Sequence, residues 1–314
     1  MKRLAGALIA PFLLCLFTAG AQSYWQSRSQ VLAVSPYAGP GDIVASNARA
    51  WWGLRGFSAA VAAGGAQPAI RICDSATGTI CTDIVILASG NLDVATASTF
   101  AGTNCTSSQC PIATVYDQSG AKQCNTGASP CDVTQATHAL RPLLILNCQG
   151  ALPCIRNSGS KRLTTATAMA QISQPYSWAW AAKRSADFTT QQNICCINGG
   201  NAGQSGFWTL ANTVFEFAIN GANFQASGAP DNNFHVVQNL FNGASSHINV
   251  NGTTTPGSIA LTAAFPAQMR TLLARDSFGA AALRGDFLEL GIWAQNNTAN
   301  EAALNSQIRT YWGF

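Results

Sequence analysis

Charged residues are scarce in this chain of 314 residues: only 10% are Asp, Glu, Lys or Arg, and the formal net charge is +4. Soluble domains usually carry about a quarter. The positive net charge does not come from a cluster of Lys or Arg, so the composition argues against a nucleic-acid partner. The abundance of Gly, Ala, Ser, Thr and Asn instead favours a neutral surface that faces neutral partners such as sugars.

Long apolar runs are also missing from most of the chain. The first one, residues 4–17, follows two basic residues and precedes "TAGAQS", in which two alanines have the small-x-small spacing of a cleavage site. This pattern predicts a secretory signal peptide over residues 1–21. No later run reaches the roughly 18 residues that a membrane helix requires. We therefore expect a secreted or periplasmic protein without a membrane span.

Cysteine, in contrast, is plentiful, and the predicted signal peptide holds one of the eleven. The other ten fall into close neighbours, and we expect each to pair with its neighbour, although spacing alone does not fix connectivity. The spacings lack the paired C-x-x-C units of zinc sites, and exported proteins favour disulfides, so no metal is predicted. The neighbours are Cys73 and Cys81, Cys105 and Cys110, Cys124 and Cys131, Cys148 and Cys154, and Cys195 and Cys196.

Short strand-like segments bounded by Gly, Asn or Asp recur along the chain, among them "TDIVILASG", "YSWAWAAKR", "FHVVQNLFNG" and "GDFLELGIWA". "AINGAN" and "NVNGTT" carry the Asn-Gly signal of tight hairpin turns. Short strands at this regular spacing favour an all-β protein built as a sandwich of antiparallel sheets. No linker separates two domains, so residues 22–314 are expected to form a single domain.

Two segments have helical spacing instead. The first is "SNARAWWGLRGFSAA", in which Ser46 is the expected N-cap and Trp51, Trp52 and Leu54 follow on a helical pattern. The second is "NTANEAALNSQIRTYWGF", which closes the sequence. Apolar residues three and four apart predict an amphipathic helix in each.

Three segments together resemble the catalytic domain of the α-L-arabinofuranosidase B family: "STFAGTNCTSSQCPIATVYDQSG" (98–120), "NICCINGGNAGQSGFW" (193–208) and "LLARDSFGAAALRGDFLELGIW" (272–293). The resemblance runs from about residue 50 to residue 293. It implies a concanavalin A-like β-sandwich (jelly roll) and a retaining glycoside hydrolase that works without a cofactor. Its partner would be an arabinose-containing plant-type polysaccharide or another glycan, and we expect a monomer.

The resemblance also assigns binding residues. Cys195 and Cys196 would form a vicinal disulfide at the floor of the arabinose pocket, near Gly206 and Trp208. The alternative is that each pairs with a different cysteine, because the side chains of neighbouring residues point apart in both strands and helices. Asp276 falls where the family carries its general acid/base; the alternative for this residue is an Asp that caps a turn.

The nucleophile departs from the family pattern, because Thr209 occupies the position of the family's glutamate. Retaining glycosidases need two carboxylates about 5 Å apart, and a threonine hydroxyl without an activating base does not replace one. Glu216, seven residues further on, is the remaining candidate nucleophile, against the alternative that it faces solvent from a strand. Glu289, between Leu288 and Leu290 of the last strand, is interpreted as structural.

Three functions therefore stay open: an arabinofuranosidase-like hydrolase, a catalytically inactive lectin-like sugar-binding domain, and a structural or adhesive surface module. Two further features have alternative interpretations. Trp178, Trp180 and Trp208 would either stack on sugar rings or fill the core. Asp117 would either bind calcium or cap a turn.

Overall fold

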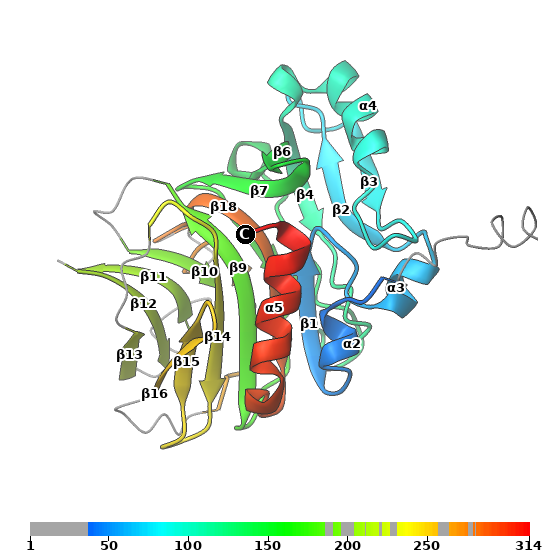
Figure 1. Cartoon of the computed structure of the whole chain (residues 1–314). Helices are drawn as coiled ribbons and strands as arrows, with labels where there is room; N and C mark the ends of the chain where they lie inside the picture. The colour runs from blue at the N-terminus through cyan, green and yellow to red at the C-terminus, as the bar shows by residue number, and fades with distance from the viewer. Residues whose placement is uncertain are drawn as a thin grey trace, which may run out of the picture. The chain divides into compact units, whose positions relative to one another are not determined.

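A computed structural model describes residues 37–185, 191–195, 204–210, 212–219, 222–226, 231–256, 264–275, 279 and 281–314. Between residues 204 and 226 it describes the backbone and, of the side chains, that of Phe215. The expected signal peptide lies outside these residues. Residues 37–314 form one compact unit (Figure 1). Within the described ranges, no helix combines the length and the apolar character needed to cross a membrane.

One sheet, which we call the β9 sheet, is built around the long strand β9 (Tyr176–Arg184). Along one edge of β9 follow β14 (His235–Phe241), β15 (His247–Val250) and β16 (Thr253–Pro256). Along the other edge lies β18 (Arg284–Trp293), which pairs first with β7 (Leu152–Ser158) and then with β1 (Ala48–Gly53). Strand β6 (Leu143–Gln149) extends the sheet beyond β7.

The second sheet, the β10 sheet, is also antiparallel throughout. Its strands, in spatial order, are β3 (Cys81–Val85), β2 (Pro68–Cys73), β4 (Cys110–Val115), β5 (Val133–Thr134), β8 (Leu163–Thr165), β17 (Thr271–Leu272), β10 (Gln192–Cys195), β11 (Gln204–Leu210), β12 (Asn212–Ile219) and β13 (Ala222–Ala226). Strand β4 also pairs with β6 and so joins the two sheets.

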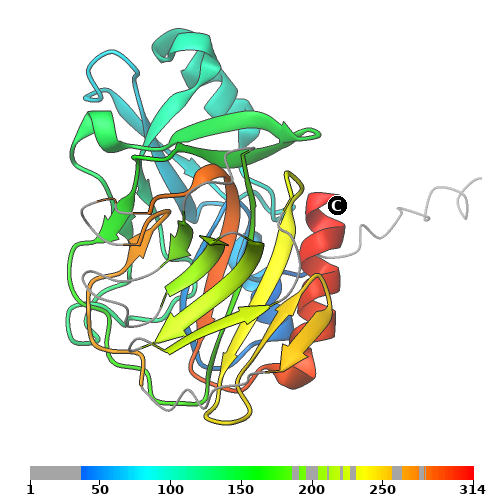
Figure 2. The same cartoon turned by 90° about the vertical axis from the view of Figure 1, so that its left-hand side faces the viewer.

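The two sheets lie face to face (Figures 1 and 2). Between them, Trp180 of β9 contacts Phe215 of β12, with ring centroids 6.4 Å apart. Within the β9 sheet, Tyr176 stacks on Phe241 of the neighbouring strand β14 at 4.4 Å. Burial of large apolar surfaces between two sheets is what holds a β-sandwich together. Trp178 and Trp180 are 1% and 0% exposed, so they fill the core rather than face a ligand. The predicted antiparallel sandwich is confirmed.

Helix α5 (Glu301–Trp312) covers the opposite face of the β9 sheet (Figure 1). It buries Leu304, Ile308 and Trp312, and its first turn is fixed by Gln238 of β14, whose amide donates to the Glu301 carbonyl at 2.9 Å. Gly313 ends the helix at φ +74°, a conformation that glycine adopts without a steric penalty. The expected helix near residue 314 is therefore confirmed, and the short helix α2 (Pro40–Ile43) contacts it.

The helix expected over "SNARAWWGLRGFSAA" is wrong in its first half. Residues 48–53 form strand β1, and the helix α3 (Ala59–Ala63) begins only after Ser58. Trp51 packs against Trp293, whereas the indole of Trp52 donates to the Cys131 carbonyl at 2.7 Å. Both tryptophans are fully buried, and a strand inside a sandwich buries both of its faces, whereas a surface helix buries one.

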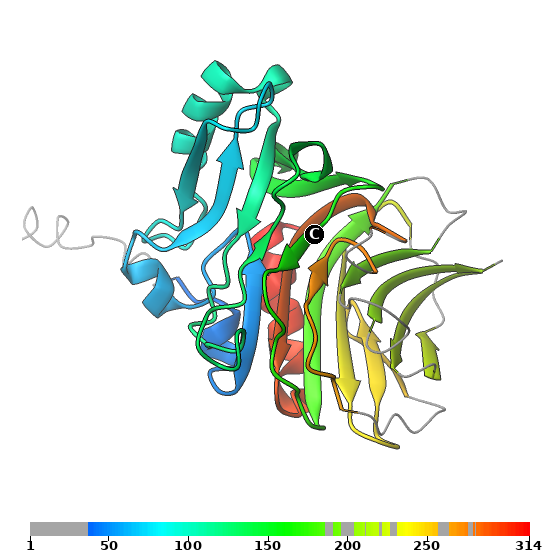
Figure 3. The ribbon, with the colours of Figure 1, turned by 180° about the vertical axis from the view of Figure 1, so that it is seen from behind.

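Helix α4 (Val94–Asn104), capped by Asp93, lies beside β2, β3 and β4 (Figure 3). The remaining helical turns are η1 (Thr106–Ser108), η2 (His138–Leu140) and η3 (Thr298–Asn300). Four of the expected disulfides are present, each between neighbours in sequence: Cys73–Cys81, Cys105–Cys110, Cys124–Cys131 and Cys148–Cys154. Each one closes a short loop, so each fixes a turn at the rim of the sandwich.

Candidate functional site

Cys195 lies at the centre of four adjacent strands. It is opposite Leu272 of β17 on one side and opposite Ser205 of β11 on the other. Ser205 in turn is opposite Phe217 of β12. The amide of Leu273 donates to the Ile194 carbonyl at 2.8 Å and fixes the register of β17 against β10. The motif with the adjacent cysteines is thus embedded in the β10 sheet.

Cys195 itself is fully buried and disulfide-bonded. The four disulfides described above do not include it, and Cys196 lies outside the described residues. The vicinal disulfide therefore stays a prediction.

The strand register separates the two candidate positions for the nucleophile. Glu216 is opposite Gly206, which is opposite Asn193, on the rung next to that of Cys195. Thr209 is opposite Thr213, close to the end of the β11–β12 hairpin. With strands about 4.8 Å apart and a rise of about 3.4 Å per residue, the backbones of residues 216 and 209 lie about 10 Å and about 14 Å from that of Cys195.

The other predicted site residues are placed in part. Gly206, Trp208 and Thr209 all belong to β11, whose side chains fall outside the description. Asp276 also lies outside the described residues, four positions after Leu272. The strands that carry the cysteine motif and Glu216, and the strand that precedes Asp276, are nevertheless neighbours in one sheet.

The two other glutamates have structural partners. Glu289 accepts hydrogen bonds of 2.5 and 2.7 Å from the guanidinium of Arg55, and both side chains are fully buried. Glu301 lies 2.6 Å from Nε2 of His247 and is also buried. Glu289 therefore stabilises the sheet, and Glu301 stabilises the start of α5. The structural role of Glu289 agrees with its interpretation from the sequence.

Asp117 has a bracing role as well. Its carboxylate accepts backbone hydrogen bonds from Trp51 at 3.0 Å, Ser119 at 3.0 Å and Cys131 at 3.1 Å. Burial raises its pKa, while these donors favour the charged form. The geometry is that of an Asp that ties a loop to β1, the second of the two interpretations of this residue.

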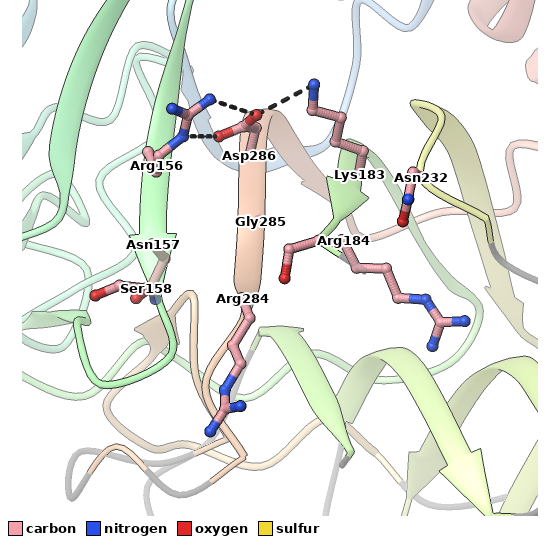
Figure 4. A pocket seen from close by; sticks show the side chains of 10 residues that line it. Arg156, Asn157, Ser158, Lys183, Arg184, Asn232, Arg284, Gly285 and Asp286 are labelled. Carbon is pink, nitrogen blue, oxygen red and sulfur yellow. Dashed lines mark hydrogen bonds and ion pairs between the residues drawn. The ribbon is translucent and has the colours of Figure 1, made fainter. Parts of the chain in front are cut away.

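A basic cavity of about 570 Å³ opens where β7, β9 and β18 meet (Figure 4). Its cationic lining consists of Arg156, Lys183, Arg184 and Arg284. Asp286 is its one carboxylate among the described residues that line it, and neutral polar groups come from Asn157, Ser158, Ser185 and Asn232. The cavity therefore combines an excess of positive charge with hydroxyl and amide groups.

Asp286 holds two of these cations in place (Figure 4). Its carboxylate accepts from Nε of Arg156 at 2.7 Å and from Nη2 at 3.1 Å, and lies 3.3 Å from Nζ of Lys183. The hydrogen bonds to Asp286 raise the pKa of Arg156. The side chain of Asp286 is 4% exposed and that of Arg156 is 45% exposed, so the cluster is anchored at its base and open at its mouth.

The cavity is connected to the β10 sheet. The backbone amide of Arg284 donates to the Gln192 side chain at 2.9 Å, and the amide of Asn193 donates to the Ala281 carbonyl at 2.8 Å. The segment that enters β18 is therefore bonded to β10, three residues before Cys195. Sequence reasoning missed this cavity, because its residues come from three strands and none of them forms a motif.

A metal centre finds little support in the described part of the chain. The one group of His, Cys, Asp and Glu side chains there that lies close enough to share an ion is Cys148, Cys154 and Asp286. The two cysteines are already joined in a disulfide. Thiolates are the ligands that such a site would need, and these sulfurs are not available as thiolates.

The fold and the motif-bearing strands define an antiparallel sandwich of two sheets. Among solved structures, the chain is similar to a mutant of a GH54 α-L-arabinofuranosidase soaked with 4-nitrophenyl α-L-arabinofuranoside (TM-score 0.64, 13% identity). It is also similar to an arabinofuranosidase complexed with arabinofuranosyl-α-1,2-xylobiose (TM-score 0.61, 13% identity) and to a GH54 α-L-arabinofuranosidase soaked with a cyclic sulfate inhibitor (TM-score 0.60, 14% identity).

Each of these matches covers 86% of this chain and 64% of the other, so the chain spans less than two thirds of their length. At this identity the likeness establishes a shared fold. No family model matches the chain, and no curated protein matches it in sequence. The resemblance seen in the three sequence motifs is thus confirmed at the level of the fold.

Proposed function

We propose that this chain is an exported glycoside hydrolase of the α-L-arabinofuranosidase type, which removes arabinofuranosyl units from an arabinose-containing polysaccharide. The observation that carries the proposal is the register around Cys195. It makes the strand before Asp276 the direct neighbour of β10 and places the strand that carries Glu216 two strands from β10 on the other side. A similar solved structure is an arabinofuranosidase in complex with an arabinofuranosyl-xylobiose, which supports this substrate class.

In the proposed mechanism, Glu216 is the nucleophile and Asp276 the general acid/base. The carboxylate of Glu216 attacks the anomeric carbon while Asp276 gives its proton to the departing glycosidic oxygen, and a glycosyl-enzyme ester forms. Asp276 then takes a proton from water, which displaces the Glu216 carboxylate and releases arabinose with retained configuration. Cys195 and Cys196 would form the apolar floor beneath the sugar ring, with Gly206 and Trp208 beside it.

The argument that favours Glu216 over Thr209 is chemical: an unactivated hydroxyl does not form the glycosyl-enzyme intermediate. The strand register gives no such preference, because positions 205, 207 and 209 of β11 fall on one face of the sheet and position 206, which is opposite residue 216, falls on the other. Glu289 and Glu301 are engaged by Arg55 and His247, so neither is proposed as the nucleophile.

Turnover of 4-nitrophenyl α-L-arabinofuranoside tests the proposal. We expect activity in the oxidised wild type and a loss of at least about a thousandfold in kcat for Glu216→Gln, because the carboxylate that forms the intermediate is gone. Asp276→Asn should lose less with this activated leaving group than with an unactivated arabinoside, since protonation matters less when the leaving group is good. Asp83→Asn, at a partly exposed carboxylate on β3, is the matched control and should keep full activity.

The same assay separates the alternatives. If the wild type shows no turnover but arabinose raises its melting temperature, the protein is a sugar-binding domain that has lost the chemistry. If neither turnover nor binding is seen, a structural or adhesive role takes precedence. Activity that survives Glu216→Gln would move the search to Thr209 or to another carboxylate.

Export is part of the proposal and has its own support. The four described disulfides need an oxidising compartment, and residues 1–21 have the pattern of a signal peptide. Mass spectrometry of the protein recovered outside the cytoplasm should show an N-terminus at Gln22. A protein that keeps residues 1–21 would contradict this part of the proposal.

A further inference from the structure

Cations outnumber carboxylates among the described residues that line the basic cavity. Arg156, Lys183 and Arg284 reach solvent, and Asp286 is the one carboxylate in this described lining. The fourth cation, Arg184, is 1% exposed and is not counted as accessible. In a chain with so few charged residues, three accessible cations at one opening are a concentrated feature.

Two of these cations, Arg156 and Lys183, are also fixed in position by interactions with neighbouring side chains. Asp286 occupies Nε and Nη2 of Arg156 and lies beside the amino group of Lys183. That amino group in turn lies 4.7 Å from the ring centroid of Phe234. Fixed donors bind an anion better than free ones, since less side-chain entropy is lost on binding. Guanidinium and ammonium groups together suit a carboxylate, which accepts several charge-assisted hydrogen bonds.

The neutral part of the lining points to a sugar. Ser158, Ser185 and Asn232 place hydroxyl and amide groups around the cations, and such groups suit the hydroxyls of a sugar ring. The volume of about 570 Å³ exceeds that of a small inorganic anion and falls within the range of small-molecule sites.

We propose that this cavity binds an acidic sugar unit, a uronic acid, through its carboxylate. The inference rests on the proposed function for the sugar class, and it extends that function to a polysaccharide that carries uronic acid side groups near its arabinose. The hydrogen bond from the Arg284 backbone amide to the Gln192 side chain joins the cavity to the strand that ends in Cys195. A polysaccharide that reaches both places would therefore present its charged unit to the cavity and its arabinose to the site at Cys195.

Titration calorimetry with D-glucuronic acid, D-glucose and inorganic phosphate tests the proposal in the oxidised full-length mature protein. We expect glucuronate to bind at least about tenfold more tightly than glucose, and to weaken as ionic strength rises, as binding between charged groups does. Lys183→Met and Arg284→Met should each weaken glucuronate binding several-fold. The matched control is Lys122→Met, which removes one positive charge at an exposed site elsewhere and should leave binding unchanged.

Three results would overturn the proposal: glucuronate binding no tighter than glucose, phosphate binding as tightly as glucuronate, or Lys122→Met weakening binding as much as Lys183→Met. The second would mean a site for free anions, and the third an effect of overall charge. Calorimetry needs no turnover. An inactive protein that binds glucuronate would refute the catalytic proposal and keep this one, and an active protein that ignores glucuronate would do the reverse.

Discussion

Strand β18 carries two carboxylates three residues apart, each paired with an arginine, and the two pairs differ in almost every other respect. Glu289 and Arg55 are both 0% exposed. Asp286 is 4% exposed, but its partner Arg156 is 45% exposed and Lys183 is 26% exposed. One strand thus supplies a sealed ion pair in the middle of the sheet and an open ion cluster at its edge.

The sealed pair is enclosed by aromatic rings. The guanidinium of Arg55 lies 4.7 Å from the ring centroid of Tyr311 of α5 and 5.9 Å from that of Trp51 of β1. Tyr37 caps the same region by donating to the Gly56 carbonyl, and burial raises its pKa well above the ordinary tyrosine value. Without water, each charge depends on its partner, so this pair locks α5, β1 and β18 together.

In the open cluster of Asp286, Arg156 and Lys183, the charges are accessible to water. Its cations reach solvent, so a second anion can approach without displacing Asp286. The difference teaches that exposure, more than the chemistry of the pair, decides whether an arginine and a carboxylate serve architecture or binding. Five variants test this comparison.

The largest effect should come from Glu289→Gln. It leaves the charge of Arg55 buried without a counter-ion, so we expect the free energy of unfolding to fall by about 3–5 kcal/mol. Urea denaturation at equilibrium, with the disulfides intact, measures this. A loss below about 1 kcal/mol would show that the pair is not as isolated from water as its burial indicates.

Arg55→Met combined with Glu289→Leu sharpens the result. Removing both charges at once should recover most of the lost stability, because well-packed apolar side chains replace a buried ion pair at little cost. A double variant as unstable as Glu289→Gln would mean that shape, and not charge, was lost.

An intermediate effect is expected at His247, whose pair with Glu301 is about 10% exposed. Burial alone lowers the pKa of His247, but the hydrogen bond and charge of Glu301 outweigh it and hold the pKa above its ordinary value of 6.5. This stabilisation is therefore full below about pH 6.5 and is lost as the pH rises through the folded-state pKa. His247→Gln should cost about 1–2 kcal/mol at pH 5.5 and less at pH 8.

His235→Gln provides the contrast in sign. Burial lowers the pKa of His235 despite Asp231 beside it, so protonation of this side chain opposes folding as the pH falls below 6.5. Its replacement should make the protein less sensitive to acid. Melting curves from pH 5 to 8 for both variants check the two signs, and parallel curves would contradict both assignments.

The smallest effect on stability should come from Arg156→Met. Its charge is partly exposed and Lys183 still neutralises Asp286, so we expect a change within about 1 kcal/mol. Urea denaturation checks this too, and added salt should reduce the difference further. If Arg156→Met lowered the free energy of unfolding as much as Glu289→Gln does, the two ion pairs would not differ in their contribution to stability.

The sequence predicted those features that depend on neighbours along the chain. Alternating strands gave the sandwich, and the spacing of Cys105 and Cys110 gave a local disulfide. The sequence-based prediction failed at Trp51 and Trp52. Their helical spacing is a coincidence, and the burial of both faces of this segment is what a strand, and not a surface helix, provides. Arg55 and Glu289 are 234 residues apart in the sequence, and no local sequence pattern predicts a contact at that separation.

The candidate site shows the same limit. The motifs identified Cys195 and its strand neighbours, but the position of Thr209 relative to Glu216 depended on the strand register, which a motif does not contain. The basic cavity depended on three strands meeting. Its cations, taken one at a time in the sequence, look like ordinary surface residues.

The pairing of β1 with β18 also bears on when the molecule can fold. Residues 48–53 lie opposite residues 289–293, so the central sheet stays incomplete until the ribosome has made residue 293. Contacts so distant in sequence form slowly. A slowly closing sheet keeps the newly made polypeptide unfolded for longer, which would suit the export proposed above.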